Sequence, residues 1–105
     1  MIDKLERVRE RFEEVSQIIV KPETMSDMKY YAQINKEYKE LEKIVAEYKK
    51  YEDVLSNLNE AKDILEHESD PEFKEMAKME LDELSEQKVA LEEALKIMLV
   101  PKDPN

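Results

Sequence analysis

The sequence predicts an all-α fold, a three-helix elongated bundle with a long antiparallel coiled-coil pair. Two observations carry this prediction. Apolar side chains recur at spacings of three and four along three long segments, the period of helices with one buried face. No segment alternates apolar and polar residues with the period of a strand, and proline-containing breaks separate the three segments.

The first helix is expected over residues 3–20, and the dipeptide Lys21-Pro22 ends it. Thr24 or Ser26 is expected to cap the next helix, because a hydroxyl oxygen can accept from the free N–H groups of a first turn. The apolar stripe of the first helix is Leu5, Val8, Phe12, Val15, Ile18 and Ile19.

The second helix is the longest, over residues 27–66, and at 1.5 Å per residue it could reach about 60 Å. Its stripe is Met28, Tyr31, Ile34, Tyr38, Leu41, Val45, Tyr48, Leu55, Leu58, Ala61 and Leu65, with Ile44, Tyr51 and Val54 beside it. The tyrosines mostly follow this stripe, so we expect buried rings with hydroxyls at the rim. Tyr30 is the best candidate for stacking on a nucleic-acid base.

The third helix is expected over residues 71–99, after a turn in which Asp70 is the N-cap and Pro71 the first helical residue. Its stripe is Phe73, Met76 or Ala77, Leu81, Leu84, Leu91, Leu95 and Met98. Lys88 falls on this stripe. Either its stem is buried with the ammonium reaching solvent, or the stripe rotates there onto Val89.

Short connections predict antiparallel neighbours. The second and third helices then pair along the rod, and the first packs along the Met28 half of the second. This arrangement predicts a rod with the 65–76 turn, which we call the tip, at one end. Pro101 is expected at the other end, where the chain continues as a hinge.

The formal net charge of −10 comes entirely from the second half of the chain. Residues 1–50 carry 11 basic and 11 acidic side chains, whereas residues 51–105 carry 6 basic and 16 acidic ones. Nucleic-acid binding depends on Lys and Arg, so any contact with a nucleic acid is expected in the first half. Lys4, Arg7 and Arg11, at helical spacing on one face, are the candidate residues.

Composition excludes several classes of site. The chain has no glycine and no cysteine, so it lacks phosphate-binding glycine loops, disulfides and thiolate metal sites. His67 is the only histidine and residue 64 is Ile, so the Glu-x-x-His metal motif is absent and no cofactor is expected. Without a signal peptide or an apolar run of about 20 residues, the chain is expected to be soluble and cytoplasmic.

The C-terminal segment contains two prolines, which stop a helix and redirect the chain. We therefore expect residues 1–100 to form one helical domain cut from a larger protein. Residues 101–105 are expected to begin a hinge to further domains, carried by Pro101, Lys102, Asp103 and Pro104.

Residues 99–105, Leu-Val-Pro-Lys-Asp-Pro-Asn, closely resemble the hinge that closes the N-terminal domain in the bacterial peptide chain release factor 1 family. Residues 70–77, Asp-Pro-Glu-Phe-Lys-Glu-Met-Ala, and residues 31–38, ending in Lys-Glu-Tyr, are also similar to segments of that family. The resemblance covers essentially the whole chain, and the hinge favours release factor 1 over release factor 2.

The resemblance implies a non-catalytic, ribosome-docking domain of a class I release factor, acting in termination at UAG and UAA. In that family a Gly-Gly-Gln motif promotes hydrolysis of peptidyl-tRNA, and a chain without glycine cannot contain it. The implied partners are the GTPase-associated centre of the large ribosomal subunit and the class II release-factor GTPase. The expected contact residues at the tip are His67, Asp70, Pro71 and Phe73.

The alternative interpretation is a free-standing coiled-coil adaptor that dimerises through an exposed seam. It predicts a dimer that depends on protein concentration, whereas the docking-domain interpretation predicts a monomer or a weak dimer for residues 1–105.

Overall fold

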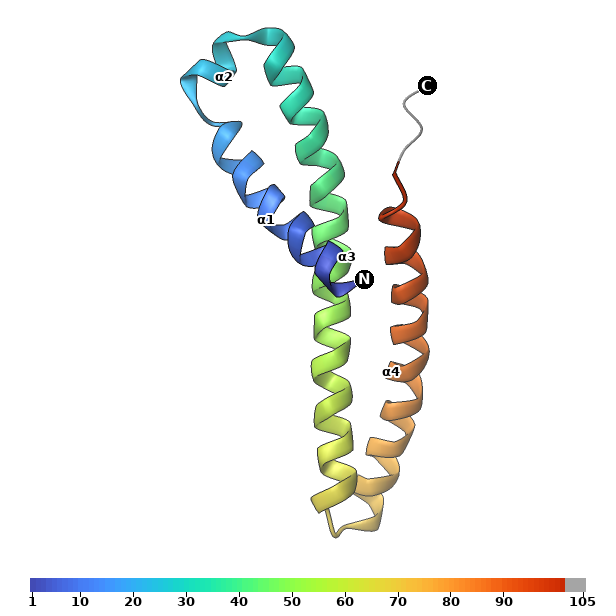
Figure 1. Ribbon diagram of the computed structural model, residues 1–105. Coiled ribbons are helices and arrows are strands. Elements are labelled where there is room, and N and C mark those ends of the chain that lie inside the picture. The colour runs from blue at the N-terminus through green and yellow to red at the C-terminus, as the bar shows by residue number, and fades with distance from the viewer. Residues whose placement is uncertain (102–105) are drawn as a thin grey trace.

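A computed structural model describes residues 1–101 and contains only helices and turns within that range. The helices are α1 (Ile2–Ile18), α2 (Pro22–Ser26), α3 (Met28–His67) and α4 (Pro71–Met98). They form a rod 63 Å long, with α3 as its central member (Figure 1). The predicted all-α elongated bundle is confirmed, and the three long helices begin and end within two residues of their expected limits.

Helices α1 and α4 both run antiparallel to α3 but cover different parts of it (Figure 1). The α4 helix has 28 residues against 40 in α3, so it ends about 18 Å short of the start of α3. Pro101 consequently lies beside Glu40 and Ile44, partway along the rod. The expectation of a hinge at one end is wrong, because the α2 corner occupies the end opposite the 68–70 turn.

The main core lies where α1, α3 and α4 meet. It consists of Leu5, Tyr48, Tyr51 and Leu95, and we call these four residues the junction core. Leu5 and Leu95 are both 0% exposed. Further apolar side chains pack around them: Ile44, Leu55, Leu91, Met98 and Leu99. The junction is the place where all three long helices share one apolar interior.

The second core follows the α3–α4 coiled coil toward the turn and contains Val54, Leu58 and Leu84. Nearer the turn, Ala61 of α3 and Ala77 of α4 are both buried. Each is eight residues from Ser69 in the turn, so the two alanines face each other across the antiparallel pair. Two small residues at facing positions allow the helix backbones to approach closely.

Lys88 keeps its place on the α4 stripe. Its side chain is half-buried, and its ammonium nitrogen lies 3.3 Å from the carboxylate of Glu92. Val89 is exposed. The prediction that the lysine stem is buried and the ammonium reaches the surface is therefore confirmed, and the rotation onto Val89 is wrong.

The connection between α1 and α3, which we call the corner, contains a helix and a cap that differ from the prediction. Pro22 begins a short helix, α2, which the sequence analysis did not predict. Neither Thr24 nor Ser26 caps α3. Thr24 is buried in the corner, and the carboxylate of Asp27 accepts from the backbone N–H of Tyr30. Because the chain turns here, Met28 is exposed and the buried stripe of α3 starts later than expected.

Candidate functional site

The turn at the far end of the rod is a well-capped connection between α3 and α4. The Asp70 carboxylate accepts from the backbone N–H of Glu72 at 2.9 Å, and Pro71 occupies the first turn of α4. The Glu68 carboxylate accepts from the backbone N–H groups of Ser69 and Asp70. The predicted roles of Asp70 and Pro71 in starting the helix are confirmed.

His67, the last residue of α3, is 69% exposed and has Nδ1 3.0 Å from a carboxylate oxygen of Asp63. This is a surface contact within one helix. Among residues 1–101, no group of three or more His, Asp or Glu side chains is placed to hold a metal ion.

Phe73 was expected in the buried stripe of α4, but it is 56% exposed. Ala77, one of the two alternatives in the prediction, takes the seam position, and Met76 is 64% exposed. Met79, at 63%, continues the exposed series one turn further along. Phe73, Met76 and Met79 follow one another at spacings of three on one side of α4, and we call them the tip patch.

The tip patch lies in an acidic environment. Residues 60–83 carry ten carboxylates and three lysines, which gives this end of the rod a formal charge of −7. Exposed apolar side chains surrounded by polar residues are typical of interaction sites. The combination of an apolar centre and negative surroundings fits a partner that presents apolar and basic groups.

The basic face of α1 is only partly available to a ligand. The Arg11 guanidinium binds Glu37 of α3 through Nε and Nη2, at 2.6 and 3.0 Å, and it also contacts Glu14. These hydrogen bonds raise the pKa of Arg11 and fix its position. Lys4 and Arg7 form no ion pair with the described residues, so the three predicted cations are not equivalent.

Arg9, which the sequence analysis did not single out, is a second bridge between α1 and α3. Its guanidinium contacts Glu52 at 2.5 Å and Glu6 at 3.5 Å. The same group lies 4.4 Å from the ring centre of Tyr48, a cation–π distance. The sequence signal for Arg9 was its position beside Val8 and one turn before Phe12, at the border of the apolar stripe of α1.

Two buried tyrosines connect the junction core to its polar rim, as expected for rings on the stripe. The Tyr48 hydroxyl donates to Glu6 at 2.6 Å, and the Tyr51 hydroxyl donates to Glu92 at 2.7 Å. Burial and these hydrogen bonds raise the pKa of each phenol to about 12. The bond from Tyr51 in turn lowers the pKa of the Glu92 carboxyl.

These phenols predict a loss of stability in alkali. In the unfolded chain a tyrosine ionises near pH 10, whereas Tyr48 and Tyr51 stay protonated in the fold up to about pH 12. The free energy of unfolding is therefore expected to fall as the pH rises from about 10 to about 12. Urea unfolding across this range should show a shallower decline of stability in the Tyr48→Phe/Tyr51→Phe variant, because it lacks the two phenols whose pKa the fold raises. An equal dependence of the unfolding free energy on pH in the two proteins would contradict the raised pKa values of Tyr48 and Tyr51.

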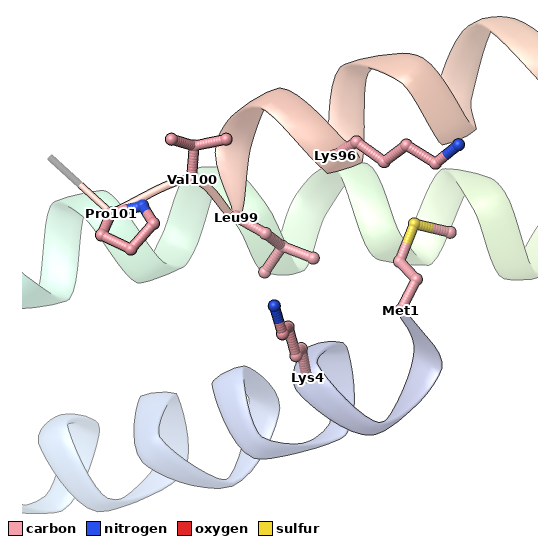
Figure 2. A pocket seen from close by; sticks show the side chains of 6 residues that line it. All are labelled: Met1, Lys4, Lys96, Leu99, Val100 and Pro101. Carbon is pink, nitrogen blue, oxygen red and sulfur yellow. The ribbon is translucent and has the colours of Figure 1, made fainter.

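An open groove lies beside Pro101, between the start of α1 and the end of α4. Met1 and Lys4 of the N-terminal segment face Lys96 and Leu99 across it, with Leu99 and the ammonium end of Lys4 opposite one another (Figure 2). The groove encloses about 300 Å³. Of the four predicted hinge residues, only Pro101 lies within the range 1–101 that the structure describes. Lys102, Asp103 and Pro104 lie outside the described residues.

Within residues 1–101, none of the helices combines the length and the apolar character needed to cross a membrane.

Comparison with known proteins identifies relatives along the whole chain. The PCRF domain matches residues 8–105. Peptide chain release factor 1 of Cytophaga hutchinsonii is 52% identical over 105 residues, covering 100% of this chain and 29% of that protein. The corresponding proteins of Amoebophilus asiaticus and Brevibacillus brevis are 54% and 46% identical over 105 residues, with 30% and 29% of their lengths covered. The chain thus spans less than a third of the curated relatives it matches. No solved structure matches it.

Proposed function

The chain belongs to the PCRF domain family, and from this premise we propose that it is the ribosome-docking domain of a class I peptide chain release factor. Its part in termination at UAG and UAA is mechanical. It holds the factor at the large-subunit GTPase-associated centre and couples it to the class II release-factor GTPase, in the bacterial cytoplasm. Residues 1–100 are the docking domain, and Pro101 begins the hinge to the parts that carry the chemistry of peptide release.

The observation that carries this proposal is the tip patch. Phe73, Met76 and Met79 are exposed apolar residues at the end of a 63 Å rod, far from the junction core. A surface at the end of a long rod can reach a partner that the rest of the protein does not touch. The acidic surroundings would repel RNA phosphates, so the tip contact is made with a protein of the GTPase-associated centre.

The predicted contact residues have separate roles at this surface. Phe73 belongs to the apolar contact, whereas Asp70 and Pro71 hold the first turn of α4 in the orientation that exposes it. His67 lies on the exposed end of α3 beside the turn and contributes to the rim of the contact.

A binding measurement with purified bacterial large ribosomal subunits tests the proposal. The variant Phe73→Gln/Met76→Gln removes apolar surface without changing charge, and it is expected to bind about tenfold more weakly. The control Met25→Gln/Met28→Gln changes two exposed methionines at the opposite end, and it should bind as the wild type does. Unchanged affinity in the tip variant would exclude the tip patch. Absence of binding by the wild type would exclude the docking function.

Contact with ribosomal RNA is a further part of the proposal and rests on α1. Lys4 and Arg7 are available to phosphates, whereas Arg11 already binds Glu37. The Lys4→Ala/Arg7→Ala variant is expected to bind large subunits more weakly and with a shallower dependence on salt. Equal affinity and an equal salt dependence in the variant would exclude this contact.

The competing function is a coiled-coil adaptor that self-associates. Exposed Ile97 and Val100 near the end of α4 favour it, because they leave apolar surface beside the groove at Pro101. Sedimentation over a range of protein concentrations separates the two functions. A stable dimer that no longer binds ribosomal subunits would support the adaptor.

A further inference from the structure

Four of the six methionine residues of this protein are at least 60% exposed. The chain has no cysteine and six methionines, so oxidants that attack sulfur can react only with thioethers. Met25, Met28, Met76 and Met79 are between 60% and 85% exposed. Met98, in contrast, is half-buried against the junction core.

Two of these methionines lie within the tip patch. Met76 and Met79 are one helical turn apart on α4, and Met76 follows Phe73 by the same spacing. Neither side chain fills the seam with α3, because buried Ala77 occupies that position. Oxidation of these two sulfurs would therefore alter the patch without opening a core.

We propose that Met76 and Met79 form a reversible oxidation site for peroxides, and that their oxidation weakens docking through the tip. The sulfur lone pair attacks one oxygen of hydrogen peroxide and the O–O bond breaks. The products are methionine sulfoxide and water. The sulfur gives up two electrons and the peroxide accepts them. Sulfoxide is polar, so the patch loses its apolar character. Sulfoxide reductases restore it with two electrons from a dithiol, which becomes a disulfide while the oxygen leaves as water.

The oxidation itself is tested on the protein alone. Peptide mapping by mass spectrometry during exposure to hydrogen peroxide should show sulfoxide at Met76 and Met79 forming at least about tenfold faster than at Met98. Far-UV circular dichroism should remain unchanged over the same period. Equal rates at the three positions, or loss of helix in step with oxidation at Met76, would overturn the assignment.

The effect on docking rests on the proposed function, and its test uses purified large ribosomal subunits. Oxidised wild-type protein is expected to bind about tenfold more weakly, with recovery after treatment with methionine sulfoxide reductases A and B. Leucine conserves the size and apolar character of methionine. The Met76→Leu/Met79→Leu variant should therefore keep its affinity after oxidation, and the matched Met25→Leu/Met28→Leu variant should lose it as the wild type does.

The outcomes separate the two proposals. If reduced protein binds and oxidised wild type binds equally well, the oxidation site has no effect on docking and this inference is wrong. The same conclusion follows if the Met76→Leu/Met79→Leu variant loses affinity on oxidation. If reduced wild type does not bind, the proposed function and the docking effect both fail, while peptide mapping still decides whether the oxidation site exists.

Discussion

Replacing Leu95 by alanine is expected to lower the free energy of unfolding by about 3 kcal/mol, the middle of the range for buried leucines. Leu95 is fully buried and belongs to the cluster that joins α1, α3 and α4. Its loss leaves a cavity that three helices share, and the surrounding side chains can fill such a cavity only in part. Since a domain of this size has about 5–15 kcal/mol of stability, the change removes a large fraction of it.

Urea unfolding followed by circular dichroism measures this effect, with Ile97→Ala as the control. Ile97 lies two residues further along α4 and is 73% exposed, so its truncation should change the stability by less than about 0.5 kcal/mol. Similar losses in the two variants would contradict the placement of Leu95 in the buried junction core.

The second large effect is expected at Ala61, which is 1% exposed in the seam near the turn. In the Ala61→Glu variant a carboxylate must enter the seam opposite Ala77, which is 3% exposed. Burial of a polar group in such a seam costs about 2–4 kcal/mol, and part of the α3–α4 pair should separate to expose it.

The control is Ala46→Glu, which makes the same change at an exposed position of the same helix. It should leave the unfolding midpoint nearly unchanged, while Ala61→Glu lowers it clearly. If both variants unfold at the same urea concentration, the register that places Ala61 against Ala77 is wrong.

The helical period predicted most of the fold. The apolar stripe of α3 and the proline at the start of α4 predicted the first and last residues of both helices to within about one residue. Both signals depend only on residues close together in the sequence. The N-cap role of Asp70 followed from the same local chemistry. Antiparallel pairing followed from the short connections.

The candidate site was harder to predict because it depends on packing between helices. Phe73 and Ala77 both fit the stripe of α4, and only the close approach of α3 decides which of them is buried. Arg11 looked like a free cation, but Glu37 lies next to it once α1 packs on α3. The α2 corner escaped prediction because a helix of five residues has too few positions to show a period.

The unequal lengths of α3 and α4 give the rod two partly independent halves. Toward the corner, α1 and the short α2 cover α3, while toward the turn α4 covers it, and α1 and α4 meet at the junction core. We therefore expect each half to open locally while the other keeps its contacts, as two cooperative units that share one helix. In this description, the packing of the junction core determines how strongly local unfolding of one half favours local unfolding of the other.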